Sequence, residues 1–259
     1  MDYLPRPFDP VLLNARINAS LAGKRLRDME QAHLRQVQEF LLQIQQEQER
    51  SDMLLRSILP APIVERLKTN PQVIADNHDE VSVLFADLVE FTQFAAKVSA
   101  TEVVELLDEV FSAFDLRAAQ LGVEKIKTIG DAYLAASGVP TARPDHAEVM
   151  AELALSMRAH IGQLARSTEI PLQIRIGLHL GPVVAGVIGR RKQTYDLWGD
   201  TVNTASRLES HGLPGEIQVS KAVYDRLSGR YLFEPRGDIQ LKGRGSFHTF
   251  LLKGKTSEC

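Results

Sequence analysis

The sequence predicts a mixed α/β (α+β) protein: a ferredoxin-like βαββαβ sandwich with C-terminal additions, preceded by a long coiled-coil helix. Two observations support this prediction. Beyond residue 79, apolar segments follow the order strand, helix, strand, strand, helix, strand. From residue 14 to residue 59, a helical pattern continues without a proline. With 259 residues, 44% of them hydrophobic, the chain can bury one sizeable core and carry an extension.

The N-terminal part predicts one long helix. From Asn14 to Leu59 there is no proline and only one glycine, and the segment is rich in Gln, Glu, Leu and Arg. Alternating steps of three and four residues define a heptad seam interrupted by two polar residues: Leu34, Val37, Leu41, Ile44, Gln48, Ser51, Leu55 and Ile58. We expect a parallel dimeric coiled coil with a weakened middle; the alternative is an amphipathic helix packed on its own domain. Pro60 and Pro62 end this helix, and a short one follows within residues 58–68.

The sandwich is predicted from the segments that follow. A near-continuous apolar run of strand-forming residues suits the interior of a sheet, and the two helices between strands are amphipathic. Gly122 is placed to end the first of them. In chain order we expect a strand at 81–88, a helix at 101–122, a hairpin at 125–135, a helix at 145–165 and two strands within 172–189.

The C-terminal additions begin with a short helix at 199–212. Asp200 or Thr201 is placed to cap its start, and Gly212 to end it. The remaining segments predict a strand at 216–220, a helix at 221–227 and a closing hairpin within 233–254.

Charge, cysteine content and apolar runs argue against a general nucleic-acid binder, a disulfide-stabilised protein and a membrane-spanning protein. A formal net charge of −3 gives no general attraction to nucleic acid or to an anionic membrane. Cys259 is the only cysteine, so no disulfide can form within one chain, which fits a reducing cytoplasm. No apolar run approaches the roughly 18 residues of a spanning helix, and the N-terminus lacks the pattern of a signal peptide. We therefore expect a cytoplasmic protein.

Two aspartates are candidates for a metal site. Asp87 falls at the end of a hydrophobic strand, where a carboxylate needs a cleft or a cation, and Asp131 lies at the tip of the predicted hairpin. Each alone also fits ordinary strand-end or turn chemistry. If their strands are neighbours, both carboxylates reach one point and form an oxygen-rich site suited to Mg²⁺ or Mn²⁺.

Four blocks of sequence resemble a known family. The segments "FADLVEFT", "EKIKTIGDAY", "GLHLGPVVAGVIG" and "YDLWGDTVNTASRLES" occur in the order and with the spacing of the class III nucleotidyl cyclase catalytic domain. The resemblance runs from about Val81 to Lys253. It implies that Asp87, Asp131 and the backbone carbonyl of Leu88 hold two divalent metal ions, Mg²⁺ or Mn²⁺.

The resemblance also implies a homodimer with two sites at its interface, each using metal aspartates of one chain and base-reading and phosphate-binding residues of the other. Lys127 and Asp196 resemble the pair that selects adenine in this family. The chemistry is consistent, because a lysine donates to N1 of adenine and a carboxylate accepts from its N6 amino group. A guanylate cyclase is expected to carry Glu and Cys there instead.

The remaining site residues are also implied by the resemblance. Asn203 and Arg207 are four residues apart on the short helix; the asparagine orients the ribose, and the arginine stabilises the pentavalent phosphate. Lys242 and Arg191 resemble the residues that hold the β- and γ-phosphates, with Arg190, Lys192 and Arg244 as neighbouring alternatives. The expected activity is conversion of ATP to 3′,5′-cyclic AMP and pyrophosphate. The alternatives are a guanylate cyclase and a non-catalytic dimerising homologue.

A second resemblance concerns the N-terminus. Residues 2–28 are similar to the last strand and helix of a response-regulator receiver domain, with Arg6 where that family has a lysine before Pro-Phe. We expect three regions: a receiver-like remnant at 1–28, a coiled-coil signalling helix and turn at 29–62, and a cyclase catalytic domain at 63–259. An upstream sensor or receiver domain is expected in the full-length protein.

Overall fold

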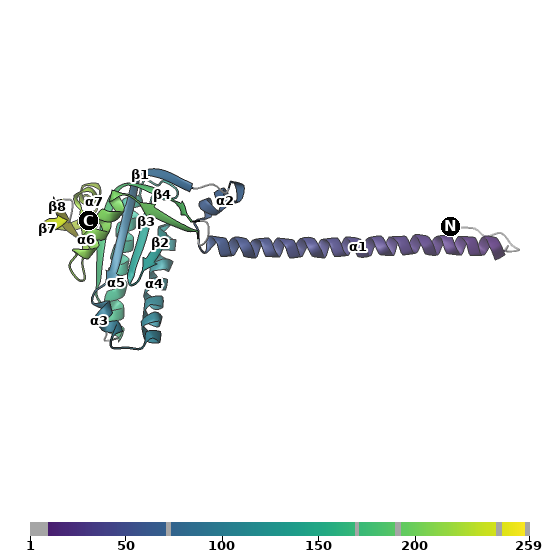
Figure 1. The fold of residues 1–259 in the computed structure, drawn as a ribbon, viewed down its shortest axis with the longest axis horizontal. Coiled ribbons are helices and arrows are strands. Elements are labelled where there is room, and N and C mark those ends of the chain that lie inside the picture. Colours follow the sequence, from purple (N-terminus) through teal and green to yellow (C-terminus); the bar gives the residue numbers. More distant parts are fainter. Residues whose placement is uncertain (1–9, 71–73, 169–170, 190–192, 242–244, 257–259) are drawn as a thin grey trace. The chain divides into compact units, whose positions relative to one another are not determined.

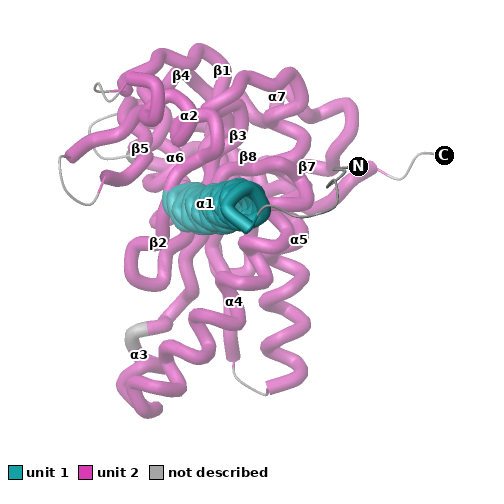
Figure 2. Tube along the Cα trace, turned by 90° about the vertical axis from the view of Figure 1, so that its right-hand side faces the viewer, with its two compact units in different colours: residues 1–58 teal, residues 59–259 magenta. Residues whose placement is uncertain are grey.

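The computed structural model describes residues 10–70, 74–168, 171–189, 193–241 and 245–256. It divides into two compact units, residues 1–58 and residues 59–259 (Figure 2).

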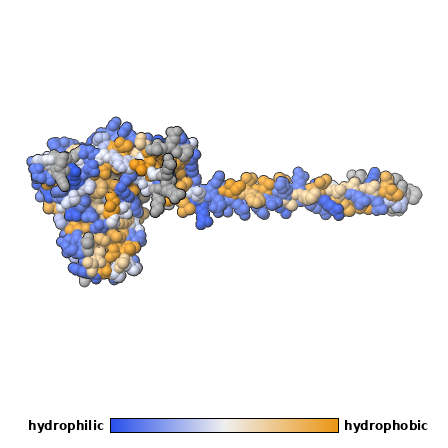
Figure 3. Space-filling view, in the orientation of Figure 1, coloured by the Kyte–Doolittle hydropathy of each residue, from blue (hydrophilic) through white to orange (hydrophobic). Residues whose placement is uncertain are grey.

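The first unit consists of one long helix. Helix α1 (Pro10–Arg56) has 47 residues, all of them described, and none is buried. On the face displayed in Figure 3, apolar patches alternate with hydrophilic stretches. Seam residues such as Leu41 and Ile44 are exposed. The long helix is therefore confirmed, and its pairing as a coiled coil stays a prediction. No helix in the described ranges is long and apolar enough to cross a membrane.

The receiver-like remnant has no boundary of its own in the described chain. Residues 10–28 belong to α1, which continues without a break through the segment predicted as a coiled coil. The predicted strand of the remnant, within residues 1–9, lies outside the described residues.

The second unit contains the predicted βαββαβ core (Figure 1). Its elements are β1 (Ile74–Leu88), α4 (Ala100–Leu121), β2 (Glu124–Ile129), β3 (Ala132–Ser137), α5 (His146–Thr168) and β4 (Ile174–Ile188). The strands lie in the order β2-β3-β1-β4, and each neighbouring pair is antiparallel. The ferredoxin-like prediction is confirmed.

The two core helices form for local reasons visible in the sequence. Ser99 and Glu102 make a capping box at the start of α4: each side chain accepts a hydrogen bond from the other's backbone N–H. Gly122 ends α4 in the left-handed conformation, as predicted. Residues Phe114 and Met157 are among those that bury the apolar faces of α4 and α5 against the sheet.

The segment 172–189 forms one strand, not the two that the sequence predicted. Pro182 lies within this strand, although proline cannot donate a ladder hydrogen bond. In the structure, the register between β1 and β4 shifts between His78 and Val81, which pair with Val183 and Gly181. The bulge at residues 79–80 therefore lies opposite Pro182, so the strand continues past a residue without an N–H.

The C-terminal additions extend the sheet. They are β5 (Thr194–Trp198), α6 (Asp200–Ser210), β6 (Ile217–Ser220), α7 (Lys221–Leu227), β7 (Tyr231–Leu241) and β8 (Gly245–Lys255). Strand β6 runs parallel to β4, β7 and β8 form the predicted hairpin, and β5 pairs with the far end of β4 to complete an 8-stranded sheet. Strand β5 and the short helix α3 (Phe91–Ala95) are additions that the sequence did not predict.

The predicted caps of α6 need correction. The helix follows Gly199, and no side chain caps its start. Thr201 instead donates its hydroxyl to the carbonyl of Pro182, 2.6 Å away. The C-cap is His211, one residue before the predicted Gly212.

Helices cover both faces of the core sheet. On β1, Leu84, Ala86 and Leu88 face α4 and α5, which lie side by side in Figures 1 and 2. The alternate residues Val83 and Phe85 belong to the opposite core, with Ile63 and Val64 of α2 (Ala61–Thr69) and with Ala205 of α6. This alternation places Asp87 on the α6 face.

Gly177 allows α6 to lie close to the sheet. A Cβ atom at this position would be 2.5 Å from the carbonyl oxygen of Ala205 and closer still to the backbone nitrogen of Glu209. Because both contacts are with backbone, no side-chain rotation can relieve them. Only glycine permits this approach, which brings Glu209 onto the sheet.

We expect Gly177→Ala to lower the free energy of unfolding by roughly 1–3 kcal/mol, because α6 must move off β4. Urea denaturation of the two proteins measures the difference. Gly229→Ala is the control, since a Cβ there meets nothing within 4 Å. Equal unfolding midpoints for the two variants would contradict the close-packing argument.

Candidate active site

Antiparallel pairing brings two carboxylates to one end of the sheet. Asp87, the next-to-last residue of β1, pairs with Ala132 of β3, and Asp131 directly precedes Ala132 in the β2–β3 turn. The two strands are neighbours, which is the condition that a shared site for both carboxylates required. Burial raises the pKa of Asp131, and the charge of the nearby Asp87 carboxylate raises it further. The two acids are therefore close enough to repel each other.

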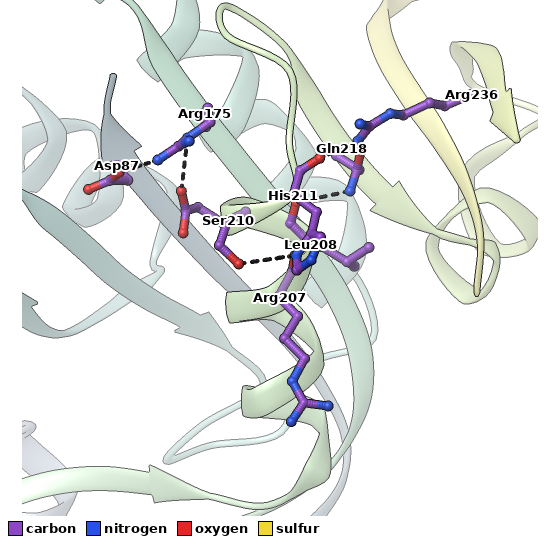
Figure 4. Close-up of polar contacts among 9 residues, drawn as sticks. Asp87, Arg175, Arg207, Leu208, Ser210, His211, Gln218 and Arg236 are labelled. Carbon is purple, nitrogen blue, oxygen red and sulfur yellow. Dashed lines mark hydrogen bonds and ion pairs between the residues drawn. The ribbon is translucent and has the colours of Figure 1, made fainter. Parts of the chain in front are cut away.

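An arginine lies on the other side of Asp87. Arg175 of β4 pairs with Asp87 in the strand register, and its Nη2 donates to Oδ2 of Asp87 at 2.8 Å (Figure 4). Its Nε lies 3.3 Å from Oε1 of Glu209 on α6. Arg175 thus links two strands of the sheet to the helix above them.

Glu209 is the most buried acid of this group, with 8% of its surface exposed. Burial raises its pKa to about 7, and the Asp87 carboxylate adds to the effect while Arg175 opposes it. Sequence reasoning missed both Arg175 and Glu209. The available signal was an arginine in an apolar strand, which requires a buried partner.

The aspartate pair fits a divalent cation. The partly buried carboxylates of Asp87 and Asp131 lie near one arginine, Arg175, which donates to Oδ2 of Asp87. Negative charge at this point therefore exceeds positive charge. Carboxylate oxygens are the ligands that Mg²⁺ and Mn²⁺ prefer, and Mg²⁺ is commonly held by one or two of them together with substrate phosphates. The side chain of Leu88 is buried, so only its backbone could contribute.

Lys127 and Asp196 form a second cluster. Lys127 lies on β2 and Asp196 on β5, 69 positions apart in the chain, yet their side chains form an ion pair. The backbone N–H of Leu197 donates to the other carboxylate oxygen of Asp196 at 2.9 Å. The structure therefore brings together the two residues predicted to read the base.

Asn203 and Arg207 lie one turn apart on α6, as predicted. Asn203 is exposed and Arg207 half-buried. Figure 4 shows Arg207 extending away from Asp87 and Arg175. The structure does not bring Arg207 to the aspartates of its own chain. The predicted phosphate ligands Arg191 and Lys242 lie outside the described residues.

The fold and these clusters define a nucleotidyl cyclase catalytic domain. Residues 73–254 match the family of adenylate and guanylate cyclase catalytic domains, and the chain belongs to this family.

Relatives include both kinds of cyclase. An adenylate cyclase of Mycobacterium tuberculosis is 48% identical over 210 residues, covering 81% of this chain and 47% of the relative. Human retinal guanylyl cyclase 2 is 41% identical over 225 residues, covering 85% of this chain and 20% of the relative. The chain thus spans about half of the mycobacterial protein and less of the human one.

Solved structures agree with the fold. The guanylate cyclase domain of RhGC from Catenaria anguillulae, in complex with GTP, superposes with a TM-score of 0.67 at 35% identity, covering 70% of this chain and 100% of that domain. The adenylyl cyclase CyaB from P. aeruginosa gives a TM-score of 0.65 at 26% identity, covering 69% of this chain and 95% of that one. The likeness covers both specificities, so it identifies a nucleotidyl cyclase without selecting the base.

The raised pKa of Glu209 can be tested through the pH dependence of stability. Its native pKa of about 7 lies above the ordinary 4.5, so between these values the folded chain binds more protons than the unfolded chain, and stability falls as pH rises. Glu209→Gln removes this dependence. As the pH rises from acidic values to about 8, we expect the free energy of unfolding of Glu209→Gln to increase by up to about 3 kcal/mol relative to that of the wild type.

Urea denaturation across this pH range, with a chelator present, measures the effect. Glu105→Gln, which neutralises an exposed glutamate on α4, is the control. Parallel pH profiles for wild type and Glu209→Gln would contradict the raised pKa.

Proposed function

We propose that this chain is an adenylate cyclase that converts ATP to 3′,5′-cyclic AMP and pyrophosphate at sites shared across a homodimer. The main observation that supports this proposal is the ion pair of Lys127 and Asp196 in a chain of the cyclase family. The most direct test is incubation with ATP or GTP and each divalent metal, with identification of the cyclic product.

The polarity of this pair favours adenine. Lys127 offers a donor to ring nitrogen N1, and Asp196 offers an acceptor to the exocyclic N6 amino group. Guanine carries a donor at N1 and an acceptor at O6, so both contacts would be mismatched. The two side chains contact each other, which supports a joint role in reading one base edge.

At the other end of the site, Asp87 and Asp131 would hold the metal ions, with the Leu88 carbonyl as a further ligand. Bound divalent ions lower the pKa of the 3′-hydroxyl and neutralise charge on the α-phosphate. The 3′-hydroxyl would attack the α-phosphate in line, and pyrophosphate would leave. The proton of the hydroxyl would pass to Asp87 or to water. We expect Arg191 and Lys242 to hold the β- and γ-phosphates.

Asn203 and Arg207 would come from the second chain, together with the base-reading residues Lys127 and Asp196. Arg207 extends away from Asp87 of its own chain, which supports its use in the partner's pocket (Figure 4). There its guanidinium would stabilise the pentavalent phosphate, while Asn203 would orient the ribose. A coiled coil formed by α1 would hold the two catalytic units together, and its register would pass a signal from an upstream sensor or receiver domain.

Base choice provides one test. We expect the double variant Lys127→Glu, Asp196→Cys to shift the kcat/KM ratio toward GTP by about tenfold or more, since a mispaired buried polar group costs roughly 1–3 kcal/mol. Steady-state assays with both nucleotides measure the ratio. Lys125→Gln is the control, because Lys125 pairs with Asp115. An unchanged ratio in an active double variant would rule out the assignment.

The shared pocket provides another test. Asp87→Ala and Arg207→Ala should each be nearly inactive, because each lesion enters both pockets of a homodimer. In a mixed dimer one pocket carries both lesions and the other none, so activity should return to about half the wild-type value. Co-expression with two affinity tags isolates the mixed dimers.

The matched control combines Asp87→Ala with Asp131→Ala. These two lesions fall in different pockets of the mixed dimer, so no intact pocket forms and no activity should return. Mixed Asp87→Ala and Arg207→Ala dimers that are as inactive as their parents would place both residues in one chain's pocket.

A further inference from the structure

Thr201 attaches the start of α6 to the sheet. Its hydroxyl donates to the backbone carbonyl of Pro182 on β4 at 2.6 Å, and only 3% of the residue is exposed. No side chain caps the first turn of this helix. The hydrogen bond from Thr201 to β4 therefore fixes the first turn to another element of the fold, in place of a local cap.

Strand β4 is locally shaped to receive the Thr201 side chain. Pro182 lies opposite the bulge of β1, where the register pairs it with no residue of that strand. Gly181, the preceding residue, leaves the necessary room: a Cβ there would be 2.6 Å from Oγ1 of Thr201. A larger residue at position 181 would push the hydroxyl away from the carbonyl that it bonds.

This anchor lies between two of the proposed substrate contacts. Asp196 on β5 precedes Thr201 by five residues, and Asn203 follows it by two. Strand β5 leads directly into α6 through Gly199, whose φ of 139° favours glycine. A shift of the first turn of α6 would therefore change the distance between the carboxylate proposed to read the base and the amide proposed to orient the ribose.

The later part of α6 is held at a different point of β4. Gly177 lies against the backbone of Ala205 and Glu209, and this contact does not involve the first turn. Loss of the Thr201 hydrogen bond would leave it in place. The helix would then pivot on Gly177, and the first turn, with Asn203, would move more than the last.

We propose that Thr201 is a positioning residue that fixes Asn203 relative to Asp196 and so sets the rate of cyclisation more than the binding of nucleotide. The inference rests on the proposed function, because it takes Asp196 and Asn203 as substrate contacts of one pocket. Displacing such a contact by about 1 Å can slow a reaction by up to about a hundredfold.

Thr201→Val keeps the shape of the side chain and removes the hydroxyl. We expect kcat to fall roughly tenfold or more and KM to change by less than about threefold, because the misplaced amide acts mainly in the transition state. Thr201→Ser keeps the hydroxyl and should retain kcat within about threefold of wild type. Gly181→Ala should reproduce the fall in kcat, since its Cβ displaces the hydroxyl.

Thr204→Val is the matched control. Thr204 is also buried on α6, but its hydroxyl donates to the carbonyl of Asp200 within the same helix, at 2.8 Å. We expect this variant to keep the wild-type kcat. Steady-state assays of the full chain, with whichever of ATP and GTP the wild type cyclises, measure kcat and KM. Urea denaturation followed by the fluorescence of Trp198, the single tryptophan, measures the stability of each variant.

The Asn203→Ala background shows whether Thr201 acts through Asn203. Residues that act through one another are not additive, so Thr201→Val should lower kcat by less than about twofold in this background. A merely structural role would lower kcat by the same factor in both backgrounds.

The outcomes separate the inference from the proposed function. Wild-type kcat in Asn203→Ala would overturn the proposed role of Asn203, and the inference with it. If Asn203→Ala is impaired, three results would each overturn the inference alone: wild-type kcat in Thr201→Val, an equal loss in Thr204→Val, or full additivity with Asn203→Ala. If Thr201→Val does not fold, Gly181→Ala replaces it in the same comparisons.

Discussion

The pairing of β1 with both of its neighbours at Asp87 is the constraint on which the candidate site depends. In one row across the sheet, Ala132 of β3, Asp87 of β1 and Arg175 of β4 lie side by side. This register places Asp131 next to Asp87 and puts a cation on the opposite side. A slip of one residue in either ladder would turn Asp87 toward the hydrophobic core formed by α4 and α5.

Local sequence signals were sufficient for the core fold. The capping residues of α4, the amphipathic patterns of α4 and α5 and the turn before Asp131 each depend on residues close in sequence. The adjacency of Asp87 and Asp131 was expected only on the condition that their strands are neighbours, and the pairing of β1 with β3 meets that condition. The single strand β4 was missed because its continuity depends on a bulge in another strand, opposite Pro182.

The sequence predicted less of the site's electrostatics. Lys127 and Asp196 were predicted from a family resemblance, but their direct contact requires β5 to return toward β2, which no local pattern encodes. The network of Arg175 and Glu209 depends on the close approach of α6 over Gly177. Such contacts are tertiary, since they join residues that are distant in the chain. A buried arginine in a strand indicates that a partner exists without identifying it.

Helix α6 presents different residues to two surroundings. Glu209 faces the sheet of its own chain, whereas Arg207, two residues earlier, extends away from Asp87 and Arg175 (Figure 4). A hydrogen-bonded helix of 11 residues moves largely as a rigid body, so a displacement of one of these residues displaces the other. In the proposed homodimer, Arg207 serves the partner's pocket. A movement of Glu209 in one chain would thus also move the arginine that the proposal assigns to the partner's pocket, and the two turnover events of such a dimer need not be independent.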